Sequence, residues 1–352
     1  MLLETHSAFW QFLMHHWAVL AIVGTCASLL LFVVLLLAKY VRIALNIFVD
    51  TPPPLSLDPR DFQILRGEEV RFRSFDGTSL RGMWLRTRNR GACRGVVVFC
   101  HEFGSDMFSC ARYAAPLLEA DFDVFTFDFR GHGQSSAQPG YKLLQWPSDK
   151  ELEDVLGATA YVEDALASAG LSPRVGVFGI SRGAGSAILA ASSDPNIACL
   201  ALDGAFSTRH TLVTLMKRWA YIFARVKLVY ENHPDAFWHF LLWLVLRFAQ
   251  PKLGRRFPSV SLALKHMTPR PVFFIHGQRD SYIRPHVTRI LYHAAAEPKY
   301  LWMVPQAKHN QSVTVAPEDY AARTTAFFRK YLAGEAVDER EITGPPASAE
   351  VA

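Results

Sequence analysis

The sequence is poor in cysteine, and none of its five cysteines belongs to a Cys-x-x-Cys pair. One lies in an apolar span, and Cys100 ends an apolar run. This pattern indicates reduced or buried thiols and argues against a disulfide framework. Clusters of His, Cys and carboxylates with metal-ligand spacing are also missing, so we expect no metal. The turn at 131–133 lacks the helix context of a nucleotide-binding glycine motif, and we expect no cofactor and no nucleic-acid partner.

Lys, Arg, Asp and Glu are missing from residues 5–38. The fully apolar part, residues 17–38, would form a helix of about 33 Å, which is long enough to cross a bilayer. A cleaved signal peptide is the alternative, but it needs a positive segment before a shorter apolar core. The first basic residue here is Lys39, after the span. The sequence therefore predicts an N-terminal transmembrane anchor over residues 1–42.

Lys39 and Arg42 flank the C-terminal side of this span, and no Lys or Arg precedes it. By the positive-inside rule, the rest of the chain is expected in the cytoplasm, with a short N-terminus outside. The unpaired cysteines agree with that placement. The reversed topology stays open, because the bias rests on two charges.

The remaining chain divides by composition. Residues 43–66, with consecutive prolines at 52–54, are predicted to form a stiff Pro-rich linker. Residues 67–333 are predicted to form one large α/β domain. Residues 334–352 are rich in Pro, Ala and Glu, and we expect a disordered tail.

Apolar runs alternate with helical patterns after an initial hairpin signal at Asp76-Gly77. This alternation predicts an α/β fold with a mostly parallel, eight-stranded, doubly wound sheet. Expected strands are 70–75, 80–87, 95–100, 122–127, 175–178, 199–202, 272–275 and 300–304. Expected helices are 106–119, 152–169, 183–193, 286–297 and 317–332.

Residues 175–191 form the stretch around which the chain is organised. A short apolar run is followed by Gly179-Ile180-Ser181-Arg182-Gly183 and then by a small-residue helical pattern. A strand, a sharp turn and a helix with serine at the apex form a nucleophile elbow, in which the two glycines avoid a clash between strand and helix. The alternative is a glycine-rich turn that carries a surface serine.

Polar residues follow the ends of several expected strands, where open α/β sheets place their sites. Asp280 follows the seventh expected strand, and His309 follows the eighth. The order Ser181, Asp280, His309 is the order that accompanies such an elbow. His309 would accept the serine proton, and Asp280 would hold the imidazole. Asp203, after the sixth strand, is the alternative acid.

Here the sequence resembles a known family. Residues 67–332 look like an α/β-hydrolase, and like bacterial membrane-anchored serine hydrolases described as esterases, lysophospholipases or peptidases. The resemblance rests on 179–183, 128–135, 277–280 and His309, which are specific only in combination.

The backbone N–H groups of Phe103 and Arg182 are the expected oxyanion donors. In such proteins the segment after the third strand is often His-Gly-aromatic, whereas this chain has Glu102 in place of the glycine. We expect the Glu102 side chain to point away from the site; otherwise the geometry of the hole changes. His101, His132 and His276 are expected to brace turns, and Asp128 and Arg130 to pair in the loop after the fourth strand.

Residues 205–270 form an insertion where such proteins carry a cap. It holds eleven Lys and Arg against two acids, a net charge of +9. Within it, residues 236–248 are strongly apolar but too short to span a bilayer, so they form a core helix, an interfacial helix or a lid. A basic, aromatic segment would also be drawn to an anionic leaflet. Every alternative favours an apolar acyl chain in the substrate.

We therefore predict a membrane-anchored serine hydrolase that cleaves carboxylic esters, with lysophospholipid or another acyl lipid as a candidate substrate. A serine peptidase or aminopeptidase that acts on amides is the first alternative. A catalytically silent protein that binds a lipid or a partner is the second, and Glu102 is its support in the sequence.

Overall fold

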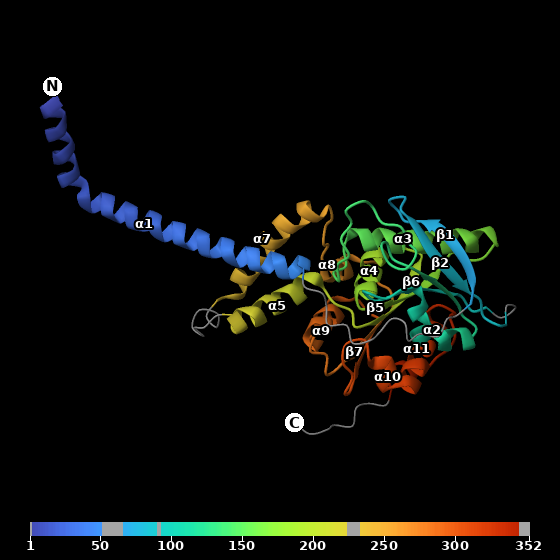
Figure 1. Ribbon diagram of the computed structural model, residues 1–352. Helices are drawn as coiled ribbons and strands as arrows, with labels where there is room; N and C mark the ends of the chain where they lie inside the picture. The colour runs from blue at the N-terminus through green and yellow to red at the C-terminus, as the bar shows by residue number, and fades with distance from the viewer. Residues whose placement is uncertain (1, 51–65, 90–92, 224–232, 345–352) are drawn as a thin grey trace, which may run out of the picture.

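The computed structural model describes residues 2–50, 66–89, 93–223 and 233–344. They contain one eight-stranded sheet with the order β1-β2-β4-β3-β5-β6-β7-β8 (Figure 1). Each of the eight expected strands is present. Their bounds are β1 Glu68–Arg73, β2 Ser79–Leu85, β3 Val96–Cys100, β4 Asp123–Phe127, β5 Val175–Ile180, β6 Ile197–Asp203, β7 Val272–Gly277 and β8 Lys299–Val304.

The sheet is parallel from β4 to β8, whereas β2 runs antiparallel to both β1 and β4. The central strands β3, β4, β5, β6 and β7 are buried along their whole length. Burial on both faces explains why these strands appear in the sequence as continuous apolar runs. The predicted mostly parallel, doubly wound sheet is confirmed.

Helices cover both faces of the sheet. Their bounds are α1 Leu2–Asp50, α2 Cys110–Glu119, α3 Asp149–Ser168, α4 Arg182–Ala191, α5 Thr208–Phe223, α7 Asp235–Leu253, α8 Val260–His266, α9 Pro285–Ala294, α10 Ser312–Val315, α11 Pro317–Tyr331 and α12 Glu339–Thr343, with a 3-10 turn, η3, at Met107–Ser109.

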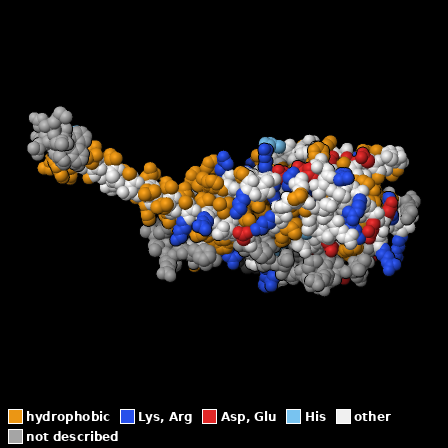
Figure 2. Space-filling view, turned by 45° about the horizontal axis from the view of Figure 1, so that its top comes forward, with side chains coloured by type: hydrophobic (Ala, Val, Ile, Leu, Met, Phe, Trp, Pro, Cys, Tyr) orange, Lys and Arg blue, Asp and Glu red, His pale blue; other side chains and the backbone are white. Residues whose placement is uncertain are grey.

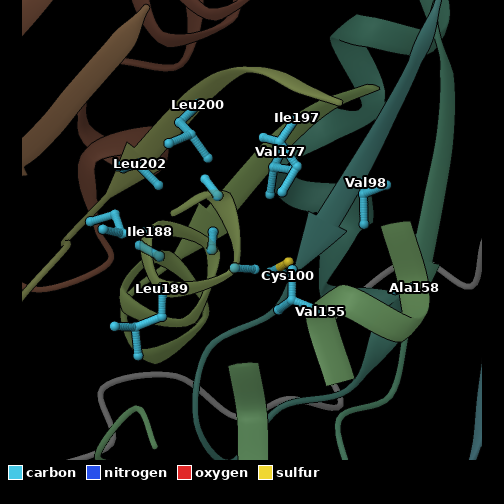
Figure 3. Close-up of a cluster of buried hydrophobic side chains, with 14 of the residues drawn as sticks. Val98, Cys100, Val155, Ala158, Val177, Ile188, Leu189, Ile197, Leu200 and Leu202 are labelled. Carbon is cyan, nitrogen blue, oxygen red and sulfur yellow. The ribbon is translucent and has the colours of Figure 1, made fainter. Parts of the chain in front are cut away.

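Two apolar cores lie on opposite faces of the sheet, as the side-chain alternation of a strand requires. On β3, Val96, Val98 and Cys100 face the core beneath α3, α4 and α8 (Figure 3). Val97 and Phe99 face the other core, beneath α2 and α11. The sheet therefore lies between two helical layers, and loops occupy the edge where its parallel strands end.

The helix α1 does not end where the sequence predicted. It runs unbroken to Asp50, so the anchor expected over 1–42 and the linker expected to begin at residue 43 overlap with one helix. The reason is packing: Val41, Ala44 and Phe48 form an apolar stripe that is buried in a third core. The prolines at 52–54 lie outside the described residues.

That third core joins α1 to the cap. Helices α5 and α7 extend from the domain alongside α1 (Figure 1), and all three contribute to the buried cluster. The Trp146 indole N–H donates to the Phe48 carbonyl at 3.0 Å, and the two rings stack with centroids 5.5 Å apart. Helix α8, inside the predicted cap insertion 205–270, instead packs on α4 and α9 and covers the sheet.

The helix α7 contains the apolar stretch 236–248, and it has two different sides. Its buried side packs in the third core, and its other side exposes Phe240, Trp243 and Phe248. Figure 2 shows apolar side chains along α1 and where α1 meets the cap, with Lys and Arg around them. The stretch is therefore a core helix that keeps an exposed aromatic face.

The predicted disordered tail, 334–352, is wrong for residues 334–344. Helix α12 lies within it, starts with a capping box between Asp338 and Glu341, and buries Ile342. Val337 is also buried, and α12 packs on α11. Composition suggested disorder, but two apolar residues and a cap suffice to dock one helical turn. Residues 345–352 lie outside the described residues.

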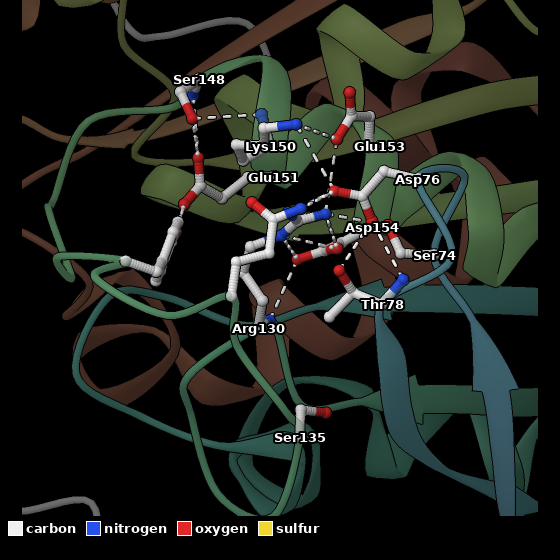
Figure 4. A network of polar contacts seen from close by, with 12 residues as sticks. Ser74, Asp76, Thr78, Arg130, Ser135, Ser148, Lys150, Glu151, Glu153 and Asp154 are labelled. Atoms are coloured by element: carbon white, nitrogen blue, oxygen red, sulfur yellow. Dashed lines mark hydrogen bonds and ion pairs between the residues drawn. The ribbon is translucent and has the colours of Figure 1, made fainter. Parts of the chain in front are cut away.

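A buried ion-pair network fixes the start of the domain to the loop after β4 (Figure 4). The fully buried Arg130 guanidinium donates to Asp154 Oδ1 from Nε at 3.0 Å and from a terminal nitrogen at 2.7 Å. It also donates to Asp76 Oδ2 at 2.8 Å and Ser74 Oγ at 2.9 Å. The network joins the β1–β2 turn, α3 and the β4 loop.

The expected pair between Asp128 and Arg130 does not form. The Asp128 carboxylate accepts backbone N–H groups from Met107 at 2.9 Å and Gln134 at 3.0 Å. Gly133 lies so close that a Cβ there would be 2.2 Å from Asp128 Oδ2. Both residues shape the loop, as predicted, but through different partners.

Replacing Asp154 by Ala should lower the free energy of unfolding by about 3 kcal/mol, because it leaves a buried guanidinium without its main partner. Denaturant unfolding of the detergent-solubilised chain measures this loss. Asp235→Ala is the control: it breaks the exposed Lys217–Asp235 pair and should leave stability unchanged. Equal effects in the two variants would contradict the proposed role of Asp154.

Candidate active site

The elbow between β5 and α4 has the predicted strand–turn–helix form. Ser181 sits at the turn with φ 53° and ψ −113°, outside the regions that non-glycine residues normally adopt. A Cβ on Gly183 would lie 2.2 Å from the Cys100 carbonyl oxygen, and one on Gly179 would lie 2.6 Å from Ala184 Cα. The glycines therefore permit the close approach that forces the serine into its strained conformation.

The structure brings Ser181, His309 and Asp280 together from three separate loops. Ser181 Oγ lies 2.8 Å from His309 Nε2, and His309 Nδ1 lies 2.6 Å from Asp280 Oδ2. Both distances are those of hydrogen bonds. Ser181 is buried except for 6% of its surface, and the His309 side chain is 13% exposed. A hydroxyl, an imidazole and a carboxylate thus form one hydrogen-bonded series at a slightly open position.

The Asp280 carboxylate is held from both sides. Its Oδ1 accepts the backbone N–H groups of Tyr282 at 2.9 Å and Ile283 at 2.8 Å. Its Oδ2 faces His309, with His276 Nε2 at 3.4 Å. Burial lowers the pKa of His276 to about 4, so His276 is neutral and Asp280 has no second cation to compete with His309.

The alternative acid, Asp203, is occupied elsewhere. Its carboxylate accepts from Ser312 Oγ at 3.2 Å and from the Tyr320 hydroxyl at 3.1 Å. Burial raises its pKa to about 7 in spite of these hydrogen bonds. Its backbone carbonyl accepts the Ser181 N–H at 2.7 Å, which ties the elbow to the end of β6.

The two expected oxyanion donors are placed by the loops after β3 and β5. Phe103 follows β3, and Arg182 is the first residue of α4, directly after Ser181. The Arg182 guanidinium lies over the Phe103 ring, 5.3 Å from its centroid, so the two segments are in contact. The helix N-terminus also points its N–H groups toward this position.

Glu102, which departs from the usual pattern, is buried beside this segment. Its carboxyl accepts from Ser109 Oγ at 3.2 Å, at the start of α2. Burial raises its pKa, which favours the neutral form. The hydrogen bond to Ser109 directs the Glu102 carboxyl toward the start of α2.

The side chain of Arg182 is a feature that sequence reasoning missed. It is fully buried, donates to the Leu144 carbonyl at 3.1 Å and lies 3.8 Å from the Glu151 carboxylate. Burial by itself raises the pKa of Glu151, but Arg182 and Arg255 outweigh that effect, and the pKa is lowered. The only signal in the sequence is one charged side chain within the elbow motif 179–183, whose other residues are uncharged.

The other histidines near the site brace the loops, as expected. His101 Nδ1 donates to the Glu102 carbonyl at 2.6 Å, and its Nε2 accepts the Phe129 N–H at 3.1 Å. His132 Nε2 lies 3.3 Å from the Arg182 guanidinium. Burial lowers the pKa of both rings, to about 3 for His132, so both are neutral.

An apolar wall extends from the site into the cap. The Tyr282 ring packs edge-on against His309 with centroids 5.2 Å apart. Tyr282, Ile283 and Phe206 also pack in the third core with α5 and α7. Among the described residues, no group of three His, Cys, Asp or Glu is arranged to hold a metal ion.

Asp280→Asn should lower kcat/KM for an ester substrate by about 10⁴-fold, because an amide cannot stabilise the imidazolium and favours the wrong tautomer. Asp203→Asn is the matched control and should change kcat/KM less than about tenfold at neutral pH. The amide oxygen still accepts from one of the two hydroxyls of Ser312 and Tyr320, and the amide N–H can donate to the other. The reverse order of the two effects would assign the acid to Asp203.

The comparisons with known proteins agree with the fold. Residues 95–234 match the family model of the alpha/beta hydrolase fold. The uncharacterized protein YfhR of Escherichia coli O157:H7 is 25% identical over 76% of this chain and 81% of its own.

Solved structures agree as well. The esterase Pf2001 of Pyrococcus furiosus superimposes with a TM-score of 0.55 at 22% identity, over 80% of this chain and 97% of that one. The esterase domain of a Rhodothermus marinus protein gives 0.51 at 19% identity, over 76% of this chain and all of that domain. The chain has the α/β-hydrolase fold.

Proposed function

We propose that this protein is a membrane-anchored serine hydrolase that cleaves carboxylic esters through an acyl-enzyme. The hydrogen-bonded series Ser181–His309–Asp280 carries the proposal, because a serine hydroxyl becomes a useful nucleophile only when a base accepts its proton. The strained turn and the hydrogen-bonded series are independent features of the chain. Both involve the same atom, Ser181 Oγ.

In the proposed reaction, Ser181 Oγ attacks the ester carbonyl carbon while its proton passes to His309 Nε2. Asp280 holds His309 Nδ1–H and stabilises the imidazolium. The carbonyl oxygen becomes an oxyanion that accepts from the N–H groups of Arg182 and Phe103. The tetrahedral intermediate collapses, and the alcohol leaves with the proton from His309. Water then repeats the sequence on the acyl-serine and releases the acid.

The acyl side of the substrate is proposed to be apolar, as in a lysophospholipid or another acyl lipid. Tyr282 packs against the His309 ring and also packs in the third core, where Phe206 is buried, so apolar surface adjoins the proposed base. The basic surplus of residues 205–270 would favour an anionic lipid surface near the site. Esters are favoured over amides by analogy with the esterases of the same fold.

The proposed anchor is α1. Its segment Met14–Asp50 is long and apolar enough to cross a membrane, with a mean hydropathy of 2.8 over its best window. Lys39 and Arg42 at its C-terminal side favour a cytoplasmic catalytic domain. The aromatic side chains on the exposed side of α7 suit the membrane–water interface next to α1.

Ser181→Ala should reduce hydrolysis of both short and long acyl esters by at least about 10⁴-fold and abolish labelling by a fluorophosphonate probe. Ser186→Ala, in the same helix, is the control and should keep both activities. A wild-type chain that takes no label would favour the silent binding protein. Faster release from peptide amides than from matched esters would favour the peptidase.

Cys93 offers a test of orientation, because it is exposed on the catalytic domain, whereas Cys100, Cys110 and Cys199 are buried. A membrane-impermeant maleimide should label Cys93 only after the cells are permeabilised. In the Cys93→Ser variant, any label that remains has reacted with another thiol. Labelling of Cys93 in intact cells would show the reversed topology.

A further inference from the structure

A cavity lies away from Ser181, where α1 packs against α5 and α7, the two long helices of the cap. It has a volume of about 280 Å³ and is lined by residues of α1, α5 and α7 and by His233 just before α7. Its walls include Val33 and Leu36 of α1, Ala220 of α5 and Trp238 of α7. Figure 2 shows apolar side chains gathered at this junction of α1 and the cap.

The lining of this cavity selects an apolar ligand. Its walls are aliphatic and aromatic side chains, and the polar groups come from Tyr40, His233 and the Trp219 and Trp238 indoles. Apolar cavities of about 150 Å³ already bind benzene rather than water. A volume of about 280 Å³ between three helices suits a longer, flexible hydrocarbon segment.

The position of the cavity indicates where such a segment would come from. Val33, Leu36 and Leu37 belong both to the cavity and to the apolar span 17–38. Leu36 keeps 38% of its surface exposed and Val33 49%, so the wall formed by α1 is open at the level of the span. With α1 in the membrane as proposed above, the medium at that level is bilayer hydrocarbon.

We propose that this cavity binds one acyl chain of a membrane lipid, taken from the bilayer beside α1. The inference rests on the anchoring proposed above but not on catalysis, because no residue of the Ser181–His309–Asp280 series lines the cavity. The bound chain would complete the packing between α1 and the cap, whose helices otherwise leave a gap of this size at the membrane surface.

The test uses the full-length chain in phosphatidylcholine vesicles that contain a phosphatidylcholine with a photoactivatable diazirine on one acyl chain. After irradiation, mass spectrometry maps the crosslinked residues. We expect crosslinks on the cavity wall formed by the cap, at Met216, Trp219 and Trp238, in addition to those on lipid-facing residues of α1.

Ala220→Trp fills the cavity from α5 and should reduce the crosslinks on the cap wall about fivefold or more, because the bulky ring occupies the acyl chain's place. Ala27→Trp makes the same change on the exposed part of α1 and should leave the cap-wall crosslinks unchanged. Leu36→Trp, with its exposed neighbour Leu35→Trp as control, fills the cavity from α1 should Ala220→Trp fail to fold.

Cap-wall crosslinks that are absent in the wild type, or unaffected by both filling variants, would overturn the proposal and leave only general contact with lipid. Hydrolysis of a short, soluble ester by each variant separates the two proposals. In the wild type, hydrolysis without cap-wall crosslinks refutes the lipid cavity alone, and cap-wall crosslinks without any hydrolysis refute the esterase alone. In a filling variant, lost crosslinks with retained hydrolysis support the lipid cavity.

Discussion

The close approach of Gly183 to the Cys100 carbonyl is the constraint on which the site depends. Because β3 and β5 are adjacent parallel strands and α4 must begin directly above them, the chain turns within one residue, and that residue is Ser181. Its positive φ is the cost of the turn, and the placement of its hydroxyl against His309 is the result. The Ser181 N–H bond to the Asp203 carbonyl fixes the same turn from β6, so two neighbouring strands hold the serine in a conformation that it would not adopt alone.

Buried charge extends this constraint away from the elbow. The Arg182 guanidinium is fully buried, and it contacts the Leu144 carbonyl, the Glu151 carboxylate and the faces of Phe103 and Phe129. Glu151 in turn accepts from Tyr141 and Ser148 and approaches Arg255, just beyond α7. A buried pair of this kind adds little net stability but penalises any arrangement that separates its members. It therefore fixes the position of the first turn of α4 relative to the cap.

The sequence was most informative where local pattern and function coincide. Continuous apolar runs identified the buried strands, and the polar residues after them identified Ser181, Asp280 and His309, because parallel strands deliver their carboxyl ends to one edge. The sequence was least informative where tertiary packing determines whether a segment is helical and which groups a side chain binds. The extension of α1 to Asp50 depends on a stripe that needs the cap as its partner, and α12 depends on α11. The partners of Asp128 and Arg130 were misassigned for the same reason: neighbours in the chain, they bind groups that only the fold brings near.

Three aromatic rings connect the proposed anchor to the site. Phe48 of α1 stacks on Trp146, Trp146 packs edge-on against Phe206 with centroids 6.2 Å apart, and Phe206 follows closely on Gly204, which lies against the His309 ring. A side chain at Gly204 would meet His309 Cε1 at 3.2 Å, so no space separates the end of β6 from the imidazole. In a close-packed interior such contacts transmit displacement, because the side chains have few voids to move into. A tilt of α1 in a bilayer would therefore displace side chains of the third core first, and then residues at the carboxyl edge of the sheet. The continuity of α1, which the sequence divides into anchor and linker, makes the proposed membrane helix a structural part of the α/β domain rather than a tether.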